Sequence, residues 1–351
     1  MSYIEKPRIS YGGQQKNQLG LTVRDYEGGM STLCAGCGHD SISAALVQAF
    51  FELNIPPHRA VKMSGIGCSS KTPAYFLGAA HGINGTHGRM AALATGANAA
   101  NRELYYVGVS GDGDSLSIGL GQFAHAMRRN LNMLYIIENN GVYGLTKGQF
   151  SASADIGTRA KHGEVNVQPP IDPVSLALCL GGSFVARSFS GDKRQLVPLI
   201  KAGLLHDGFA LIDVISPCVT FADHAGSTKS YAYSREHMRE AVHADFVPRE
   251  KNIEIEYPEG AAISVQLHDG SLITLRKVAP DFQATDRGAT ISYLDRHQRQ
   301  GEIVTGLLHV RGDAGDLHHV ANTVQQPLNE VPYEQLCPGA AALDELHEAY
   351  R

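Results

Sequence analysis

The chain has 351 residues, 43% of them hydrophobic, which is enough to bury one large core or two ordinary ones. Its formal net charge is −5 and it has no basic stripe, so nothing in the composition supports nucleic-acid binding. No apolar run is long enough to cross a bilayer, and we expect no contact with a membrane.

Helical and strand patterns alternate along most of the chain. In chain order we expect a polar arm at 1–30, helix 44–53, strand 61–66, helix 90–102, strand 104–109, helix 118–129, strand 133–137, helix 174–180, strand 184–187, helix 195–206 and strand 209–215. This alternation predicts an α/β fold with a doubly wound, mostly parallel sheet, here assigned to residues 31–247.

The pattern changes after residue 247. Residues 262–267 and 272–275 read as the strands of a β-hairpin, joined by a His-Asp-Gly turn at 268–270. A polar tail punctuated by prolines begins at 315. We expect residues 248–351 to form a C-terminal extension that includes a subunit-contact tail.

Polar groups follow two successive predicted strands. Gly-Asp-Gly-Asp at 111–114 follows one strand, and Asn-Asn at 139–140 follows the next. A βαβ unit brings both to the carboxyl edge of the sheet. The Asp112 carboxylate, the Asn140 side chain and the Val142 carbonyl are hard oxygen ligands that suit Mg²⁺ shared with a diphosphate. The first motif alone is equally typical of an ordinary turn, so the second motif decides the interpretation.

Four of the six cysteines lie in turns flanked by glycine or proline, namely Cys34, Cys37, Cys68 and Cys218. A C-x-x-C pair with two distant cysteines can bind zinc, hold an iron–sulfur cluster or act in redox exchange, and the spacing does not discriminate among these. The charged, polar opening at 1–16 indicates a reducing, cytoplasmic setting rather than disulfides. We expect Cys179 to be a small core residue and Cys337 to lie in a terminal segment.

Gly-Asp-Gly followed by Asn-Asn resembles the thiamine diphosphate motif, in which the Asp and the second Asn bind the metal. Together with Cys-Ala-Gly-Cys-Gly-His at 34–39 and Gly-Ile-Gly-Cys-Ser-Ser-Lys at 65–71, it closely resembles the β subunit of 2-oxoacid:ferredoxin oxidoreductases. The resemblance covers about 31–237, with a weaker match at 301–346. It implies a thiamine diphosphate-binding fold in which the four turn cysteines carry a [4Fe–4S] cluster beside thiamine diphosphate and Mg²⁺.

Further residues match positions that have functional roles in this family. Lys71 is expected to pair with a substrate carboxylate, although most lysines are simply solvated. Leu145 matches a wall of the substrate pocket, and His87 is expected to face the cofactor unless it only caps a helix or faces solvent. Contacts with the cofactor are expected from Ser69, Ser70, His87, Gly111, Gly113, Asp114, Asn139, Gly144, Leu145 and Thr146.

The resemblance implies CoA-dependent, reversible oxidative decarboxylation of a 2-oxoacid with ferredoxin as electron acceptor. The pairing of Lys71 with Leu145 and the stretch 301–308 resemble the 2-oxoglutarate branch, which would yield succinyl-CoA and CO₂, with pyruvate as the alternative substrate. The glutamate that activates thiamine diphosphate is implied to come from a partner α subunit of the fused γ–α type, in a heterodimer or an α₂β₂ heterotetramer.

Two other classes of protein stay open. A non-oxidative thiamine-dependent lyase would use Asp112 and Asn140 but leave the four turn cysteines unused. A zinc-stabilised assembly protein would use the cysteines but leave the diphosphate pattern unexplained.

Overall fold

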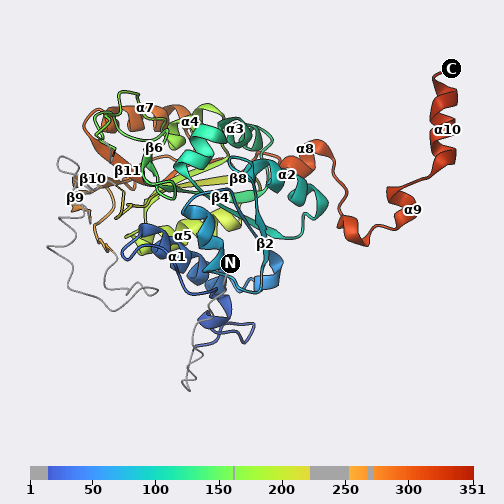
Figure 1. Ribbon diagram of the computed structural model, residues 1–351, viewed down its shortest axis with the longest axis horizontal. Coiled ribbons are helices and arrows are strands. Elements are labelled where there is room, and N and C mark those ends of the chain that lie inside the picture. The colour runs from blue at the N-terminus through green and yellow to red at the C-terminus, as the bar shows by residue number, and fades with distance from the viewer. Residues whose placement is uncertain (1–14, 161–162, 222–252, 268–271) are drawn as a thin grey trace.

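The computed structural model describes residues 15–160, 163–221, 253–267 and 272–351. A nine-stranded sheet with helices on both faces forms its centre (Figure 1). The strands are β1 (Ala60–Ser64), β2 (His81–Asn84), β3 (Tyr105–Gly111), β4 (Met133–Asn139), β7 (Phe184–Phe189), β8 (Phe209–Ile215), β9 (Ala262–Gln266), β10 (Leu272–Lys277) and β11 (Glu302–Val310). A separate small hairpin consists of β5 (Val142–Tyr143) and β6 (Gln149–Phe150).

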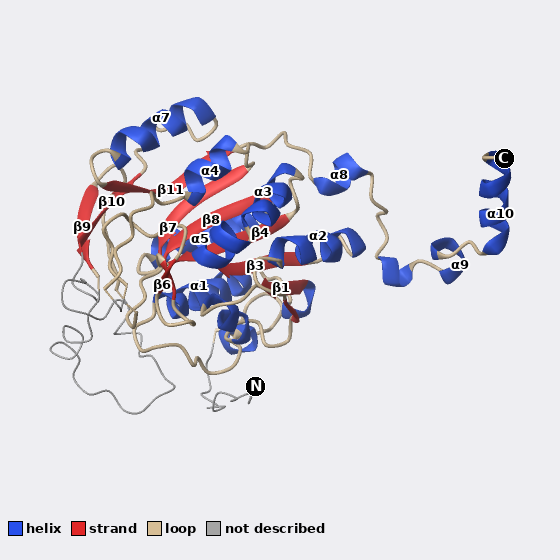
Figure 2. Cartoon of the chain, turned by 45° about the horizontal axis from the view of Figure 1, so that its top comes forward, coloured by secondary structure: helices blue, strands red, loops and turns tan. Residues whose placement is uncertain are grey.

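Helices cover both faces of the sheet (Figure 2). The described helices of the chain are α1 (Gly38–Glu52), α2 (Met90–Ala100), α3 (Leu120–Arg128), α4 (Pro173–Cys179), α5 (Lys193–Leu204), α7 (Arg287–Gln298) and α8 (Leu317–Ala321), followed by α9 (Tyr333–Leu336) and α10 (Ala340–Ala349), which lie away from the sheet. In β4, Leu134 and Ile136 pack on the side of α1 and α5, whereas Tyr135 and Ile137 pack on the side of α2, α3, α4 and α7. Apolar side chains on both faces are typical of buried parallel strands.

The strand order is β2-β1-β3-β4-β8-β7-β11-β10-β9. Within the described sheet, the antiparallel pairs are β7 with β11 and β9 with β10. The chain passes outward from β1 to β2 and then returns to the other side of β1 as β3, which creates a topological switch point between β1 and β3. Ligands of such sheets bind outside the carboxyl ends of the strands at this point.

The predicted doubly wound, mostly parallel sheet is confirmed, and the strand predicted at 209–215 is β8. Two predicted helix starts are wrong. Helix α1 begins at Gly38 rather than at 44, because Cys37 has extended backbone and the helix follows it directly. The helix predicted at 118–129 corresponds to α3, which begins at Leu120. The residues before it form a π-helix, η4 (Gly113–Ile118).

Burial corrects one further prediction and places part of the predicted arm. Cys179 is exposed rather than in the core, because it lies in the last turn of α4, whose buried face is formed by residues such as Ala177 and Leu178. The described part of the predicted arm packs on its own domain, since Tyr26 is fully buried and its ring meets that of Phe51 edge-on at 5.8 Å.

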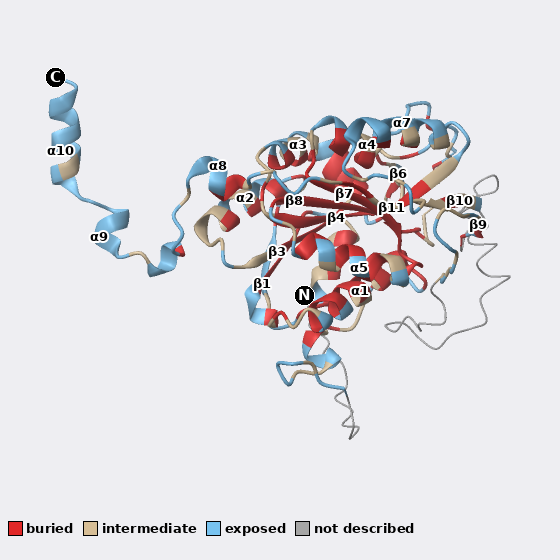
Figure 3. Ribbon diagram, turned by 180° about the vertical axis from the view of Figure 1, so that it is seen from behind, coloured by how far each residue is buried: buried red, intermediate tan, exposed pale blue. Residues whose placement is uncertain are grey.

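The C-terminal residues form two structural parts. Strands β9 to β11 continue the main sheet, so the extension predicted from 248 shares the sheet of the preceding domain. The predicted boundary at 247 and the predicted turn at 268–270 lie outside the described residues. The last two helices, α9 and α10, contain no buried residue and project away from the body (Figure 3). Among the described helices, none is both long and apolar enough to span a membrane.

Candidate cofactor site

A cavity of about 470 Å³, partly open to solvent, lies at the switch point and reaches the end of β4. Its lining residues are His39, Ile66, Gly67, Cys68, Ser69, His87, Gly111, Asp112, Gly113, Asp114, Asn140, Val142, Tyr143, Gly144, Leu145 and Thr146. The loops that follow β1, β3 and β4 therefore converge on one cavity.

Asp112 follows β3 directly, and its side chain is buried. The Oδ2 atom accepts hydrogen bonds from the Gly141 amide at 3.0 Å and from the hydroxyls of Ser151 and Ser153. Burial raises the pKa of Asp112, whereas the two serine hydrogen bonds act to lower it. The carboxylate is thus held by the loop that follows β4.

Asn140 lies at the end of β4 and lines the same cavity as Asp112. Its Oδ1 accepts a hydrogen bond from the Val142 amide at 3.1 Å, which is an Asx turn. A buried carboxylate, an amide side chain and a backbone carbonyl are hard oxygen donors of the kind that Mg²⁺ shares with phosphates. Asp112, Asn140 and Val142 therefore fit a magnesium diphosphate.

The loops after β3 and β4 touch each other at Tyr143. Its hydroxyl donates to the Gly113 carbonyl at 2.9 Å, and a Cβ at Gly113 would lie 2.5 Å from the tyrosine ring. Only glycine allows this close approach. The ring of Tyr143 also meets that of His87 edge-on, with centroids 5.9 Å apart, so both aromatic side chains form part of the cavity wall.

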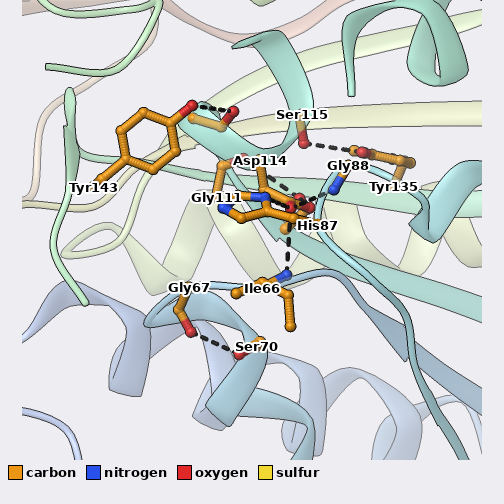
Figure 4. A network of polar contacts seen from close by, with 12 residues as sticks. Ile66, Gly67, Ser70, His87, Gly88, Gly111, Asp114, Ser115, Tyr135 and Tyr143 are labelled. Atoms are coloured by element: carbon orange, nitrogen blue, oxygen red, sulfur yellow. Dashed lines mark hydrogen bonds and ion pairs between the residues drawn. The ribbon is translucent and has the colours of Figure 1, made fainter. Parts of the chain in front are cut away.

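The Asp114 carboxylate joins three segments around the cavity (Figure 4). Its Oδ1 accepts from the amides of Gly88 at 2.7 Å and Ile66 at 3.3 Å and lies 2.5 Å from His87 Nδ1. Its Oδ2 accepts from the Ser110 hydroxyl at 2.7 Å. Both carboxylate oxygens of Asp114 therefore accept hydrogen bonds from the protein, and these bonds connect the segments that form the cavity walls.

Two of the four turn cysteines, Cys68 and Cys218, lie against the Gly144 loop. The Cys37 amide donates to the Cys34 carbonyl at 3.0 Å, which closes the C-x-x-C turn. A Cβ at Gly144 would lie 3.2 Å from the sulfur of Cys68 and 3.7 Å from that of Cys218. Cys68 also lines the cavity, so the thiols and the predicted diphosphate site share one wall.

Burial raises the pKa of two of these thiols, those of Cys37 and Cys68. Burial, together with the Cys218 and Cys34 thiols, raises the pKa of Cys68 to about 11. Burial raises the pKa of Cys37 well above its usual value, and Cys218 adds to this effect. Within the described ranges, no three or more His, Cys, Asp or Glu side chains are grouped so that they could hold a metal ion. Ligation by the thiols would release protons.

The structure places some predicted residues just outside the cavity. Lys71 and Ser70 lie in the 3₁₀ helix η3 (Ser69–Ala74); the lysine is half-buried, and the Ser70 hydroxyl donates to the Gly67 carbonyl at 2.6 Å. Asn139 is also outside the cavity lining, and its amide donates to Asp213 at 3.0 Å.

Sequence reasoning missed several wall residues. They are His39, Ile66, Gly67 and Tyr143. His39, Ile66 and Gly67 lie within two residues of a turn cysteine, and that adjacency was the available signal. Tyr143 had no comparable signal, because its role depends on contact with a loop far away in the sequence.

Comparison with protein-family models matches residues 65–214 to the thiamine pyrophosphate enzyme C-terminal TPP binding domain. The 2-oxoacid:ferredoxin oxidoreductase subunit beta of Saccharolobus solfataricus is 43% identical over 191 residues, which are 54% of this chain and 63% of that protein. The 2-oxoglutarate synthase subunit KorB of Methanocaldococcus jannaschii is 38% identical over 191 residues, 54% of this chain and 69% of that protein. The chain spans about three fifths of the length of the first relative.

A solved structure shows the same fold over most of the chain. It is described as 2-oxoglutarate:ferredoxin oxidoreductase from Magnetococcus marinus with 2-oxoglutarate, coenzyme A and succinyl-CoA bound. The match has a TM-score of 0.70 and 28% identity, and it covers 93% of this chain and 97% of the other.

Proposed function

The chain belongs to the family of 2-oxoacid:ferredoxin oxidoreductase β subunits, and on this premise we propose that it acts in the CoA-dependent oxidative decarboxylation of a 2-oxoacid. The proposed substrate is 2-oxoglutarate, converted reversibly to succinyl-CoA and CO₂. The proposed cofactors are thiamine diphosphate, Mg²⁺ and one [4Fe–4S] cluster, with ferredoxin as electron acceptor. A partner α subunit, in a heterodimer or an α₂β₂ heterotetramer, completes the enzyme.

One observation supports this function above others: the cavity wall that carries the diphosphate pattern also carries thiols. Cys68 lines the cavity with Asp112 and Asn140, and Cys218 lies with Cys68 against Gly144. A [4Fe–4S] cluster is held by four Cys thiolates, so it would give these thiols a role that a diphosphate site alone does not. A lyase would have no use for them.

The proposed roles follow from the positions of the side chains. Asp112, Asn140 and the Val142 carbonyl would hold Mg²⁺ and thereby the diphosphate, while His87 and Leu145 would border the reacting end of the cavity. When bound, thiamine diphosphate supplies a nucleophilic carbon for the 2-oxo group and an electron sink for the departing CO₂. A [4Fe–4S] cluster supplies one-electron transfer to a ferredoxin.

The activating carboxylate is expected to come from the partner subunit. Among the described residues that line the cavity, the carboxylates are Asp112 and Asp114, and neither is a glutamate. Asp112 is assigned to the metal, and Asp114 is engaged by protein donors. We therefore expect the isolated β chain to be inactive.

The first experiment measures iron, acid-labile sulfide and thiamine diphosphate in the complex with its partner subunit, purified without oxygen. We expect about four iron, four sulfide and one thiamine diphosphate per β chain. Asp112→Ala should lose thiamine diphosphate but keep iron, whereas Cys218→Ser should lose iron.

The same variants separate the alternatives. Iron retained in Cys218→Ser would place any cluster on other cysteines or on the partner. Zinc without sulfide would exclude the electron-transfer function and leave the lyase if thiamine diphosphate is present. Thiamine diphosphate retained in Asp112→Ala would overturn the metal-site assignment.

The substrate is tested at Lys71. A second carboxylate on 2-oxoglutarate would give this half-buried lysine a partner that pyruvate lacks. Lys71→Ala should raise KM for 2-oxoglutarate far more than KM for pyruvate. Lys201→Ala, which removes an ammonium that pairs with Glu52 on the outside of α5, is the matched control. An equal effect on both substrates would exclude Lys71 as the partner of the distal carboxylate.

A further inference from the structure

A line of polar contacts leads from Asp112 back into the sheet. The Ser153 hydroxyl lies 2.5 Å from Asp112 Oδ2 and 2.9 Å from Asn139 Oδ1. Its single proton serves both acceptors, so the hydroxyl is fixed between them. The Asn139 amide nitrogen in turn donates to Asp213 Oδ1 at 3.0 Å.

This line ends in a buried ion pair that spans neighbouring strands. Arg187 Nε donates to Asp213 Oδ2 at 2.7 Å, and its Nη2 donates to Asp172 Oδ2 at 2.6 Å. Asp172 caps α4 by accepting from the Ser175 amide at 2.7 Å. Because Arg187 is on β7, Asp213 on β8 and Asn139 on β4, three adjacent strands anchor the line.

The hydrogen bonds to Asp112 are one-sided. In the described part of the chain, Gly141, Ser151 and Ser153 all donate to Oδ2. These three donors fix the orientation of the carboxylate relative to the loop that follows β4. Carboxylates that bind metals are commonly oriented by such hydrogen bonds to the atoms around them.

We propose that Ser153 is a positioning residue for Asp112, and that Asn139 sets Ser153 with the support of the Asp213–Arg187 pair. The inference rests on the proposed function, because it assumes that Asp112 binds the metal of thiamine diphosphate. It also changes the role of Asn139, which the sequence pattern assigned to cofactor contact and which here acts through Ser153.

The test measures metal binding directly. The complex with the partner subunit is freed of divalent metal and titrated with Mn²⁺ in the presence of thiamine diphosphate, and free Mn²⁺ is followed by electron paramagnetic resonance. Mn²⁺ accepts the same oxygen ligands as Mg²⁺. Ser153→Ala should raise the Kd for Mn²⁺ about tenfold to a hundredfold, and Ser153→Thr, which keeps the hydroxyl, should recover most of the affinity.

Two controls separate positioning from general damage. Ser188→Ala removes a fully buried hydroxyl on β7 that donates to Gln195, and it should leave the Kd for Mn²⁺ unchanged. At saturating Mn²⁺, Ser153→Ala should bind thiamine diphosphate as the wild type does, because only the orientation of the ligand carboxylate is lost. Weakened cofactor binding at saturating metal would indicate a structural defect and overturn the inference.

A double-mutant cycle tests the link through Asn139. Asn139→Ala should also weaken Mn²⁺ binding, and the double variant Asn139→Ala/Ser153→Ala should bind no worse than the weaker single variant. Independent, multiplying effects would overturn the role of Asn139, and an unchanged Kd in Ser153→Ala would overturn the role of Ser153. A wild-type complex that binds neither Mn²⁺ nor thiamine diphosphate would instead refute the proposed function.

Discussion

His39 and Glu138 form a buried pair between the thiols and the cofactor cavity. His39 Nδ1 lies 2.6 Å from the Ser216 hydroxyl and 3.6 Å from Glu138 Oε2, and both side chains are almost fully buried. Burial lowers the pKa of His39 to about 4, and burial, with the Asp40 charge, raises the pKa of Glu138 well above its usual value. His39 is therefore neutral at pH 7, and the cavity is lined by a neutral imidazole.

The depressed pKa of His39 predicts an acid-sensitive stability. An unfolded histidine binds its proton near pH 6.5 and the folded one only near pH 4, so acidification through this window favours the unfolded chain. Between pH 7 and pH 5 the wild type should lose about 2 kcal/mol of unfolding free energy more than His39→Asn, as measured by denaturant titration at each pH.

The exposed His58 provides the control for this comparison. His58→Asn should show the same dependence on pH as the wild type. Parallel pH profiles for the wild type and His39→Asn would show that His39 is not kept neutral by the fold.

At the scale of elements, the central strands could be predicted from the sequence, but the start of helix α3 could not. The central strands are continuous apolar runs buried on both faces, and such runs are visible in a sequence. The start of α3 was not visible, because the π-helix after Asp112 depends on a bond from the Gly119 amide to the Asp114 carbonyl, at 2.8 Å. π-Bulges of this kind are frequent at functional sites.

Site residues could be predicted from the sequence where they directly follow a strand. They could not be predicted where a loop from elsewhere in the chain brings them to the site. Asp112 and Asn140 each follow a strand, and the topology of a parallel sheet brings them together. Ser151 and Ser153 reach Asp112 only because the β5–β6 hairpin turns back across the cavity. No local pattern encodes such a contact. The antiparallel pairing of β11 with β7 was hidden for the same reason.

At the scale of the whole molecule, the tail differs from everything before it. The body buries apolar side chains on both faces of the sheet, whereas α10 exposes Leu343 and Leu346 and is followed by the exposed Tyr350. These positions are spaced three and four residues apart, so they lie along one side of the helix. This helix extends from the body (Figure 1), and the subunit-contact role expected from the sequence stays a prediction that its exposed apolar side allows to be tested.

Two variants separate a contact role of the tail from a folding role. Leu343→Ala/Leu346→Ala should leave the unfolding free energy within about 0.5 kcal/mol of the wild type, because both side chains are exposed in this chain. If the partner subunit buries them, their loss should weaken association at least about tenfold, as measured by sedimentation at several concentrations. Leu205→Ala removes an exposed leucine at the end of α5 and should leave association unchanged. Equal association of all three proteins would show that the apolar side of α10 lies outside the subunit interface.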